Sequence, residues 1–245
     1  MIITSRANER IKSARALQQH KEREARGFHL IEGDKLVMEA IRSGAEIETV
    51  FAREGAAFPV GYEVLTVSDS VMEAISTQKS PQALCAVVRT PDTSSPENYP
   101  PGLVIVLDRL QDPGNLGTII RTADALGAAG LLLSPDSADP FSPKGLRSAM
   151  GSTYHIPIWI GELAREIPRM KEQGFVCVCG HLKGSDSLPS HGGKTALVIG
   201  NEGQGVSNEV TELCIPYRLP MRGQAESLNA AVFAALMMQR LLDEH

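Results

Sequence analysis

Three glycine-containing corners of the sequence carry the side chains best suited to hold a polar ligand. Residues 112–117 read DPGNLG, and Arg121 follows one turn further on. Residues 199–205 read IGNEGQG, and residues 219–229 read LPMRGQAESLN. Glycine lets a ligand approach the backbone closely, while amide, carboxylate, hydroxyl and guanidinium groups can orient hydroxyls and phosphates. These corners are therefore the candidates for binding and catalysis.

Each corner follows an apolar run that is typical of a buried strand. Ligands of open α/β sheets bind beyond the carboxyl ends of the strands, which is where the corners fall. Helical stretches between most of the runs predict βαβ units and a mainly parallel sheet. The strands predicted in this part of the chain are 103–107, 130–134, 155–160, 175–179, 195–200 and 215–219.

The first corner leads into a predicted amphipathic helix. Apolar residues recur from Leu116 to Leu126 at the spacing of one helix face. Arg121 lies roughly 140° around the helix from Leu116 and is expected to point away from the core. Asn115 is expected at or near the N-cap. Taken alone, Asn115 as a helix cap and Arg121 as an exposed side chain can be explained without any binding or catalytic role.

The last predicted helix is strongly apolar. Glu226 or Ser227 is expected to open it, and the residues from Val232 to Met238 are apolar on every side of the helix. Such a helix must be buried, either in the core of its own domain or against a second subunit.

The first third of the chain predicts a separate, smaller α/β domain. Residues 90–102 contain four prolines and cannot hold a regular element, so they are predicted to form an interdomain linker. The predicted domains are 1–90 and 102–245, joined by a linker at 91–101. Within the first domain the predicted strands are 28–31, 47–52, 62–67 and 83–89, and the predicted helices are 34–43 and 68–75.

Composition limits the function classes. The 245 residues are 42% hydrophobic and 22% charged, as in ordinary globular proteins. No apolar run approaches the ~20 residues that span a bilayer, and the first residues lack the apolar core of a signal peptide. Four scattered cysteines predict a reducing, cytoplasmic location. No metal is expected, because Cys177 and Cys179 have no second ligand pair nearby.

The charge is unevenly distributed. The net charge of −5 gives no indication of nucleic-acid binding. Residues 1–26, however, contain seven Lys or Arg and only three Glu. Two interpretations stay open: a solvated helix face, or an arm that contacts phosphates. The arm would include Arg6, Arg10 and Lys12.

Together and in this order, the three corners resemble the sequence motifs of the SpoU-type (TrmH-like) RNA ribose 2′-O-methyltransferases of the SPOUT superfamily. The first motif is matched by Asp112–Gly117 with Arg121, the second by Ile199–Gly205, and the third by Leu219–Met221 with Ser227–Asn229. The first domain resembles the ribosomal-protein-like RNA-binding extension of this family, through LIEG at 30–33 and STQKSPQ at 76–82. The resemblance implies a C-terminal trefoil knot, a homodimer and S-adenosylmethionine as cofactor.

The resemblance also implies residue roles. Arg121 is assigned to the target 2′-hydroxyl or its phosphate, and we favour a phosphate clamp over a general base because a guanidinium pKa lies above ~12. The remaining assignments are listed by role: catalytic support from Asn115, Glu202, Ser227 and Asn229; cofactor binding by Gly200, Asn201, Gly205, Leu219, Met221 and Leu228; and RNA binding by Arg6, Arg10, Lys12, Lys144 and Arg147.

The expected reaction is methylation of a ribose 2′-hydroxyl in RNA, with large-subunit ribosomal RNA favoured as substrate. The extra N-terminal domain favours a large structured target. Alternatives are transfer RNA as substrate, a catalytically inactive RNA-binding protein of the same fold, an RNA base methyltransferase on a related knotted fold, and a generic nucleotide-binding α/β enzyme.

Overall fold

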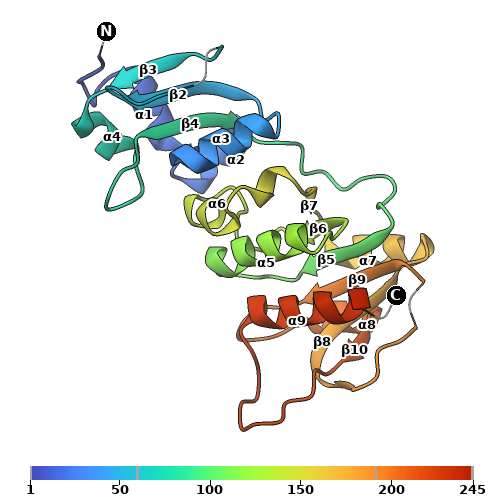
Figure 1. The fold of residues 1–245 in the computed structure, drawn as a ribbon. Helices are drawn as coiled ribbons and strands as arrows, with labels where there is room; N and C mark the ends of the chain where they lie inside the picture. Colours follow the sequence, from blue (N-terminus) through green and yellow to red (C-terminus); the bar gives the residue numbers. More distant parts are fainter. Residues whose placement is uncertain (1, 59–60, 191, 244–245) are drawn as a thin grey trace. The chain divides into compact units, whose positions relative to one another are not determined.

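A computed structural model describes residues 2–58, 61–190 and 192–243 of the chain (Figure 1). Its contacts divide it into two compact units. The first contains the chain up to Pro91 together with Asp139–Tyr154, and the second contains Asp92–Ala138 together with the chain from His155 onward. The predicted functional domains at 1–90 and 102–245 remain a proposal. The path of the chain adds a feature that the sequence did not suggest, because residues 139–154 leave the second unit and pack in the first.

The first unit is built on a mixed sheet with the strand order β1-β4-β2-β3. β4 is antiparallel to both of its neighbours, whereas β2 and β3 are parallel. The predicted strands and helices are confirmed, with β3 starting two residues late. The elements are α1 (Glu9–Ala16), α2 (His20–Arg26), β1 (Phe28–Glu32), α3 (Asp34–Arg42), β2 (Ile47–Arg53), β3 (Val64–Val67), α4 (Asp69–Ile75) and β4 (Leu84–Arg89).

Both faces of this sheet are covered. In β4, Cys85 and Val87 pack with α1 and α4 on one face, while Ala86 and Val88 pack with α3 on the other. A strand that is buried on both sides must be apolar throughout, which is why β4 has no polar alternation.

Residues 139–154 complete the core on the α3 face. They form α6 (Pro143–Ala149) and a 3₁₀ turn, η1 (Ser152–Tyr154), and Phe141 and Leu146 join the apolar cluster beneath α3. The guanidinium of Arg23, 7% exposed, donates to the Asp139 carboxylate at 2.6 and 2.8 Å. These buried contacts fix the segment against the first unit.

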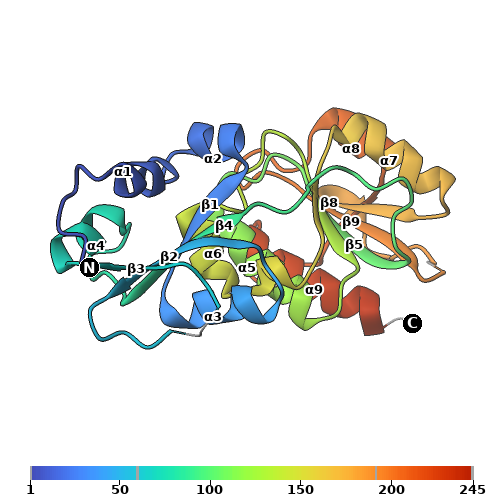
Figure 2. The same ribbon diagram turned by 90° about the horizontal axis from the view of Figure 1, so that it is seen from above.

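The second unit is built on a parallel sheet with the order β10-β8-β9-β5-β6-β7. The predicted α/β fold with a mainly parallel sheet is confirmed. Figure 2 shows the sheet between two pairs of helices, with α5 and α9 on one face and α7 and α8 on the other. The elements are β5 (Gly102–Leu107), α5 (Pro113–Ala125), β6 (Gly130–Leu133), β7 (Ile158–Ile160), α7 (Leu163–Glu172), β8 (Val176–Ser185), β9 (Lys194–Ile199), α8 (Asn208–Leu213), β10 (Ile215–Tyr217) and α9 (Ala230–Asp243).

Three strand predictions are corrected in length. β7 begins only at Ile158, and β10 ends at Tyr217 rather than at residue 219. β8 continues to Ser185, six residues beyond its apolar run, because its distant end still pairs with Tyr217 of β10 across a register shift. Backbone pairing, rather than apolar character, extends this strand.

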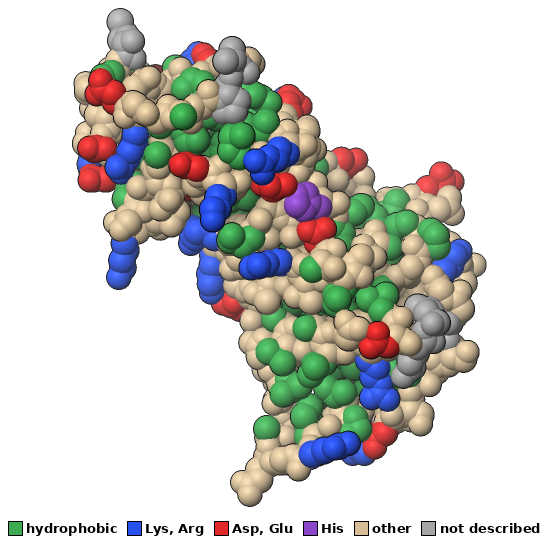
Figure 3. All heavy atoms as spheres, in the orientation of Figure 1, with side chains coloured by type: hydrophobic (Ala, Val, Ile, Leu, Met, Phe, Trp, Pro, Cys, Tyr) green, Lys and Arg blue, Asp and Glu red, His purple; other side chains and the backbone are tan. Residues whose placement is uncertain are grey.

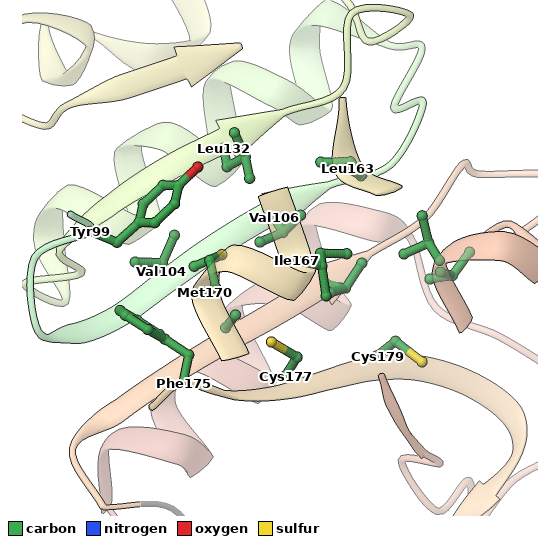
Figure 4. Packing of buried hydrophobic residues seen from close by; sticks show 14 of the residues in the cluster. Tyr99, Val104, Val106, Leu132, Leu163, Ile167, Met170, Phe175, Cys177 and Cys179 are labelled. Carbon is green, nitrogen blue, oxygen red and sulfur yellow. The ribbon is translucent and has the colours of Figure 1, made fainter. Parts of the chain in front are cut away.

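The proline-rich stretch lies along the second unit. Residues 92–101 hold no helix or strand, as their prolines predict. Tyr99 is nevertheless buried among Val104, Met170 and Phe175 (Figure 4), and its hydroxyl donates to Glu166 at 2.8 Å. The Thr93 carbonyl accepts a hydrogen bond from the Ile160 amide at 2.7 Å. This part of the predicted linker is therefore a fixed strap.

The fold gathers the three corners at one edge of the sheet. β5, β9 and β10 run in the same direction, so their carboxyl ends, which lead into the three corners, lie at the same edge. In the part of the chain that the structure describes, no helix is long and apolar enough to cross a membrane.

A buried histidine makes the stability of the first unit sensitive to pH. Burial, and secondly the charge of Arg23, lower the pKa of His29 to about 3 from an ordinary 6.5. Between these values the unfolded chain binds a proton that the folded chain does not, so the free energy of unfolding falls as the pH falls through this window. From pH 7 to pH 5 we expect a loss of about 2 kcal/mol from this residue.

Urea unfolding of wild type and His29→Gln at pH 7 and pH 5 measures this loss. Glutamine does not titrate but can still bond to Thr90 and Tyr154, the two partners of the imidazole. The variant should therefore show a smaller pH dependence. Equal pH dependence in both proteins would contradict the assignment.

Candidate active site

The carboxylate of Glu202 joins the first two corners. Its Oε1 accepts hydrogen bonds from the Asn115 side chain at 3.0 Å and from the Asp112 backbone amide at 3.1 Å. Its Oε2 accepts from the Gln111 amide at 3.2 Å. The loop after β9 is thus anchored on the entry to α5.

The Asn115 side chain also links this network to the third corner. While its Nδ2 donates to Glu202, its Oδ1 accepts a hydrogen bond from Asn229 Nδ2 at 3.0 Å. Asn229 in turn starts α9, because its Oδ1 accepts from the amides of Ala231 and Val232 at 2.9 and 3.3 Å. Three of the predicted catalytic residues therefore form one continuous network.

One predicted helix start is refined and the other is wrong. Asp112, rather than Asn115, is the N-cap of α5: its carboxylate accepts from the Asn115 amide at 2.8 Å, and Pro113 occupies the first helical turn. α9 begins at Ala230 behind Asn229, rather than at Glu226 or Ser227. In both corners several cap-forming residues compete, and the one with the correct backbone position is selected.

The network keeps Glu202 ionised. Partial burial opposes ionisation, but the hydrogen bonds from Asn115, from its own amide and from the amides of Gln111 and Asp112 outweigh burial and lower the pKa of Glu202. An anionic carboxylate accepts such bonds best, so the charge of Glu202 and the geometry of the loops support each other.

Residues 200–205 form a tight turn that only glycine permits at its start. A Cβ on Gly200 would lie 2.1 Å from the carbonyl carbon of Gly205 and from the amide of Val206. Asn201 and Gly205 exchange both backbone hydrogen bonds, and Gly205 has φ +70°. The Asn201 side chain accepts from the amides of Gly203 and Gln204. Asn201 therefore shapes the turn.

Arg109 is a functional candidate that the sequence analysis missed. It follows β5 with φ 56°, a left-handed conformation that is costly for arginine. Its carbonyl accepts from Asn201 at 3.0 Å, and its guanidinium donates to Gln204 and to the buried carboxylate of Asp108, each at 3.2 Å. Nothing in the sequence pattern around residue 109 signals this conformation; the available signal is the charged pair Asp108 and Arg109 at the carboxyl end of a buried strand.

The structure places Arg121 on the exposed side of α5, as predicted. In the described residues its guanidinium has neither a hydrogen bond nor an ion pair, so its five donors are available to a substrate. Ser227 is exposed in the segment before α9 and is not part of the Glu202 network.

The residues assigned to the cofactor suit an adenosine-containing ligand. Leu219, Met221 and Leu228 are half-buried side chains in the irregular segment between β10 and α9. Across the same sheet edge, Gly203 and Gly205 expose backbone, and a Cβ on Gly205 would meet open space. Half-buried apolar side chains and glycine backbone that no Cβ covers provide the flat, close surface that a purine and its ribose require.

The predicted RNA-binding residues lie in the first unit, and each is engaged there. Arg6 pairs with Glu73, Arg10 with Glu63 and Lys12 with Glu9, which agrees with the solvated-face interpretation of the N-terminal segment. The arm interpretation remains a prediction. Lys144 and Arg147 lie on α6, where Arg147 donates to the Thr77 hydroxyl at 2.9 Å.

Comparison with known proteins divides the chain at the proline-rich stretch. The family model described as the SpoU rRNA Methylase family matches residues 102–239, and the one described as the MRM3-like substrate binding domain matches residues 8–86. A full-length relative is the 23S rRNA (guanosine(2553)-2′-O)-methyltransferase RlmP of Bacillus subtilis (strain 168), 34% identical over 98% of both chains.

Solved structures agree. The AdoMet-bound rRNA methyltransferase from Sinorhizobium meliloti superposes with a TM-score of 0.88 at 32% identity, covering 99% of this chain and 98% of that one. The SpoU methyltransferase AviRb from Streptomyces viridochromogenes, in complex with AdoMet, gives 0.87 at 28% identity and covers 97% and 98%.

The parallel sheet and the three linked corners thus define an AdoMet-dependent RNA methyltransferase. The chain belongs to the SpoU rRNA methylase family. The predicted family, the predicted enzyme class of RNA ribose 2′-O-methyltransferase and the predicted cofactor are confirmed by these comparisons.

The turn at residues 200–205 makes a sharp prediction about cofactor binding. Gly200→Ala should lose S-adenosylhomocysteine binding, because its Cβ collides with backbone that cannot move without opening the turn. Gly192→Ala is the matched control, since Gly192 is exposed ahead of β9, outside the three corners, and its Cβ would meet nothing within 4 Å. Calorimetric titration of both folded variants measures the difference, and equal affinities would refute the steric argument.

Proposed function

We propose that this enzyme methylates a ribose 2′-hydroxyl in large-subunit ribosomal RNA. The observation that carries the proposal is the network of Glu202, Asn115 and Asn229, which joins the three corners beside the exposed Arg121. The ribosomal substrate is supported by RlmP, a 23S rRNA methyltransferase that aligns over nearly the whole chain. The predicted cytoplasmic location is part of the same proposal.

The reaction requires alignment more than activation. Bound S-adenosylmethionine supplies a methyl group on a positively charged sulfur, which is already a good leaving group. The protein must bring a ribose oxygen in line with that methyl group, and alignment of this kind can lower a barrier by roughly 7–11 kcal/mol. The network can hold the reacting groups in a fixed position, because both the Nδ2 and the Oδ1 of Asn115 are hydrogen-bonded.

Arg121 is proposed to hold the target nucleotide. Its planar guanidinium can bind a phosphate in two-point fashion, orient the ribose and favour loss of the hydroxyl proton to phosphate or solvent. Ser227, exposed in the neighbouring corner, is proposed to contact the substrate or cofactor from the other side.

Substitution of Arg121 tests this role. Arg121→Ala should abolish methyl transfer, whereas Arg121→Lys should retain part of it. Lysine keeps the positive charge that attracts the phosphate and loses only the planar two-point geometry of the guanidinium. Transfer of radiolabelled methyl into unmodified large-subunit RNA and into transfer RNA measures both activity and substrate class. S-adenosylhomocysteine titration should be unchanged in both variants. If Lys is as inactive as Ala while ligands still bind, a planar-fork or base role replaces the clamp.

The last helix supports a dimer. Within one chain α9 is buried on one side only: Ala234, Met237 and Met238 are in the core, whereas Val232 and Leu236 are each 49% exposed. Of the two predicted ways to bury this helix, the core of its own domain therefore accounts for one side. Figure 3 shows hydrophobic side chains gathered over α9. We propose that this side packs against a second copy of the chain and that RNA and cofactor meet across that interface.

The knot belongs to the same proposal. β10 lies at one edge of the sheet, and α9 then returns to pack against β9 and β5. A C-terminal chain that doubles back over earlier strands supports the knotted course expected for the family.

A charge on the exposed side of α9 should separate the dimer. Leu236→Glu is expected to give a monomer by light scattering and to lose methyl transfer. Ile160→Glu makes the same kind of change at an exposed apolar residue of β7, outside α9, and is the control. A Leu236→Glu protein that remains a dimer with full activity would rule out this interface.

A further inference from the structure

A small hollow in the first unit is lined by residues from three separate stretches of chain. Its floor is apolar and comes from β1, α3 and α6, and its polar members are Glu32, Thr77 and Arg147. The hollow admits about one water-sized group. It therefore suits a single oxygen atom of a ligand rather than a nucleobase.

Glu32 organises one wall of the hollow. Its carboxylate, in a residue only 9% exposed, accepts hydrogen bonds from the Ser76 hydroxyl and from the amides of Thr77 and Gln82. All three donors belong to the loop 76–82, so one buried anion fixes the loop at both ends. The loop then presents the Thr77 hydroxyl to Arg147.

Arg147 is held in place without being neutralised. Its Nη1 donates to the Thr77 hydroxyl at 2.9 Å, and within the described residues this is its only polar contact. A hydroxyl fixes the direction of the guanidinium but leaves its charge and four of its five N–H groups free. Other arginines of this unit form ion pairs with carboxylates, namely Arg6, Arg10, Arg23, Arg42, Arg53 and Arg89.

We propose that Arg147, aimed by Thr77 and Glu32, forms a phosphate-binding subsite for the substrate RNA. A phosphate oxygen would lie on the Arg147 side of the hollow and accept from the free N–H groups of that guanidinium, while the Glu32 carboxylate stays engaged by its three donors from the loop 76–82. Glu32 and Thr77 act as positioning residues. The proposal rests on RNA being the substrate.

This subsite extends beyond the part of the chain that resembles a substrate-binding domain. The matching family model ends at residue 86, whereas Arg147 lies in the segment 139–154, within the range matched to the methylase family. The methylase sequence thus contributes an RNA-contacting side chain to the first unit.

The test is RNA binding by the full chain as a function of salt, using an unmodified large-subunit ribosomal RNA transcript. Arg147→Met should weaken binding about tenfold and reduce the slope of log affinity against log salt by about 0.7–0.9, the share of one phosphate contact. Arg42→Met removes one charge from an exposed arginine of the same unit that is already paired with Glu39, and it should change neither value.

Substitutions of Thr77 test whether it positions Arg147. Thr77→Val removes the hydroxyl and should raise the KM for RNA about threefold with kcat unchanged, whereas Thr77→Ser keeps the hydroxyl and should retain the wild-type KM. Equal salt slopes for Arg147→Met and Arg42→Met would overturn the subsite. S-adenosylhomocysteine binding and methyl transfer by wild type test the proposed function separately. If wild type methylates RNA while the Arg147 variant binds it normally, only the subsite fails; if wild type does not bind RNA, both fail.

Discussion

The arrangement of the active site depends on a carboxylate that is partly removed from water and must be satisfied by neighbouring donors. Glu202 belongs to the loop after β9, yet its hydrogen-bond donors belong to the first turn of α5 and the residues before it. Asn115 can donate to this carboxylate only with its Nδ2, which leaves its Oδ1 for Asn229. The positions of three loops thus follow from one charge and one oriented amide.

The first unit uses the same physical solution for a different purpose. Glu32, also at the end of a strand, accepts hydrogen bonds from a loop that has no regular structure of its own. In both units the carboxylate costs desolvation energy, and the charge-assisted hydrogen bonds offset that cost. In both units the side chains that are left unneutralised, Arg121 and Arg147, lie next to elements anchored in this way.

Local patterns predicted the elements well and their junctions poorly. Uniformly apolar runs such as 103–107 and 196–199 favoured strands buried on both faces, and these residues are buried strand residues. Helix starts were misplaced because Asp112 and Asn115, or Ser227 and Asn229, have similar capping preferences and only backbone position decides between them. The pairing of Arg23 with Asp139 joins residues 116 positions apart, and no local pattern contains it. The left-handed conformation of Arg109 is imposed by its contacts with Asp108 and Asn201.

The excursion of residues 139–154 has a consequence for how the chain folds during synthesis. When the ribosome has released the first 91 residues, the sheet of the first unit can form, but Phe141 and Leu146 do not yet exist to cover the α3 face, and Arg23 lacks its carboxylate. Domains usually fold as they emerge. Here about fifty further residues must be synthesised before the core of the first unit is closed. In the interval an apolar face and the Arg23 guanidinium, which lacks its carboxylate, are exposed to the other components of the cell.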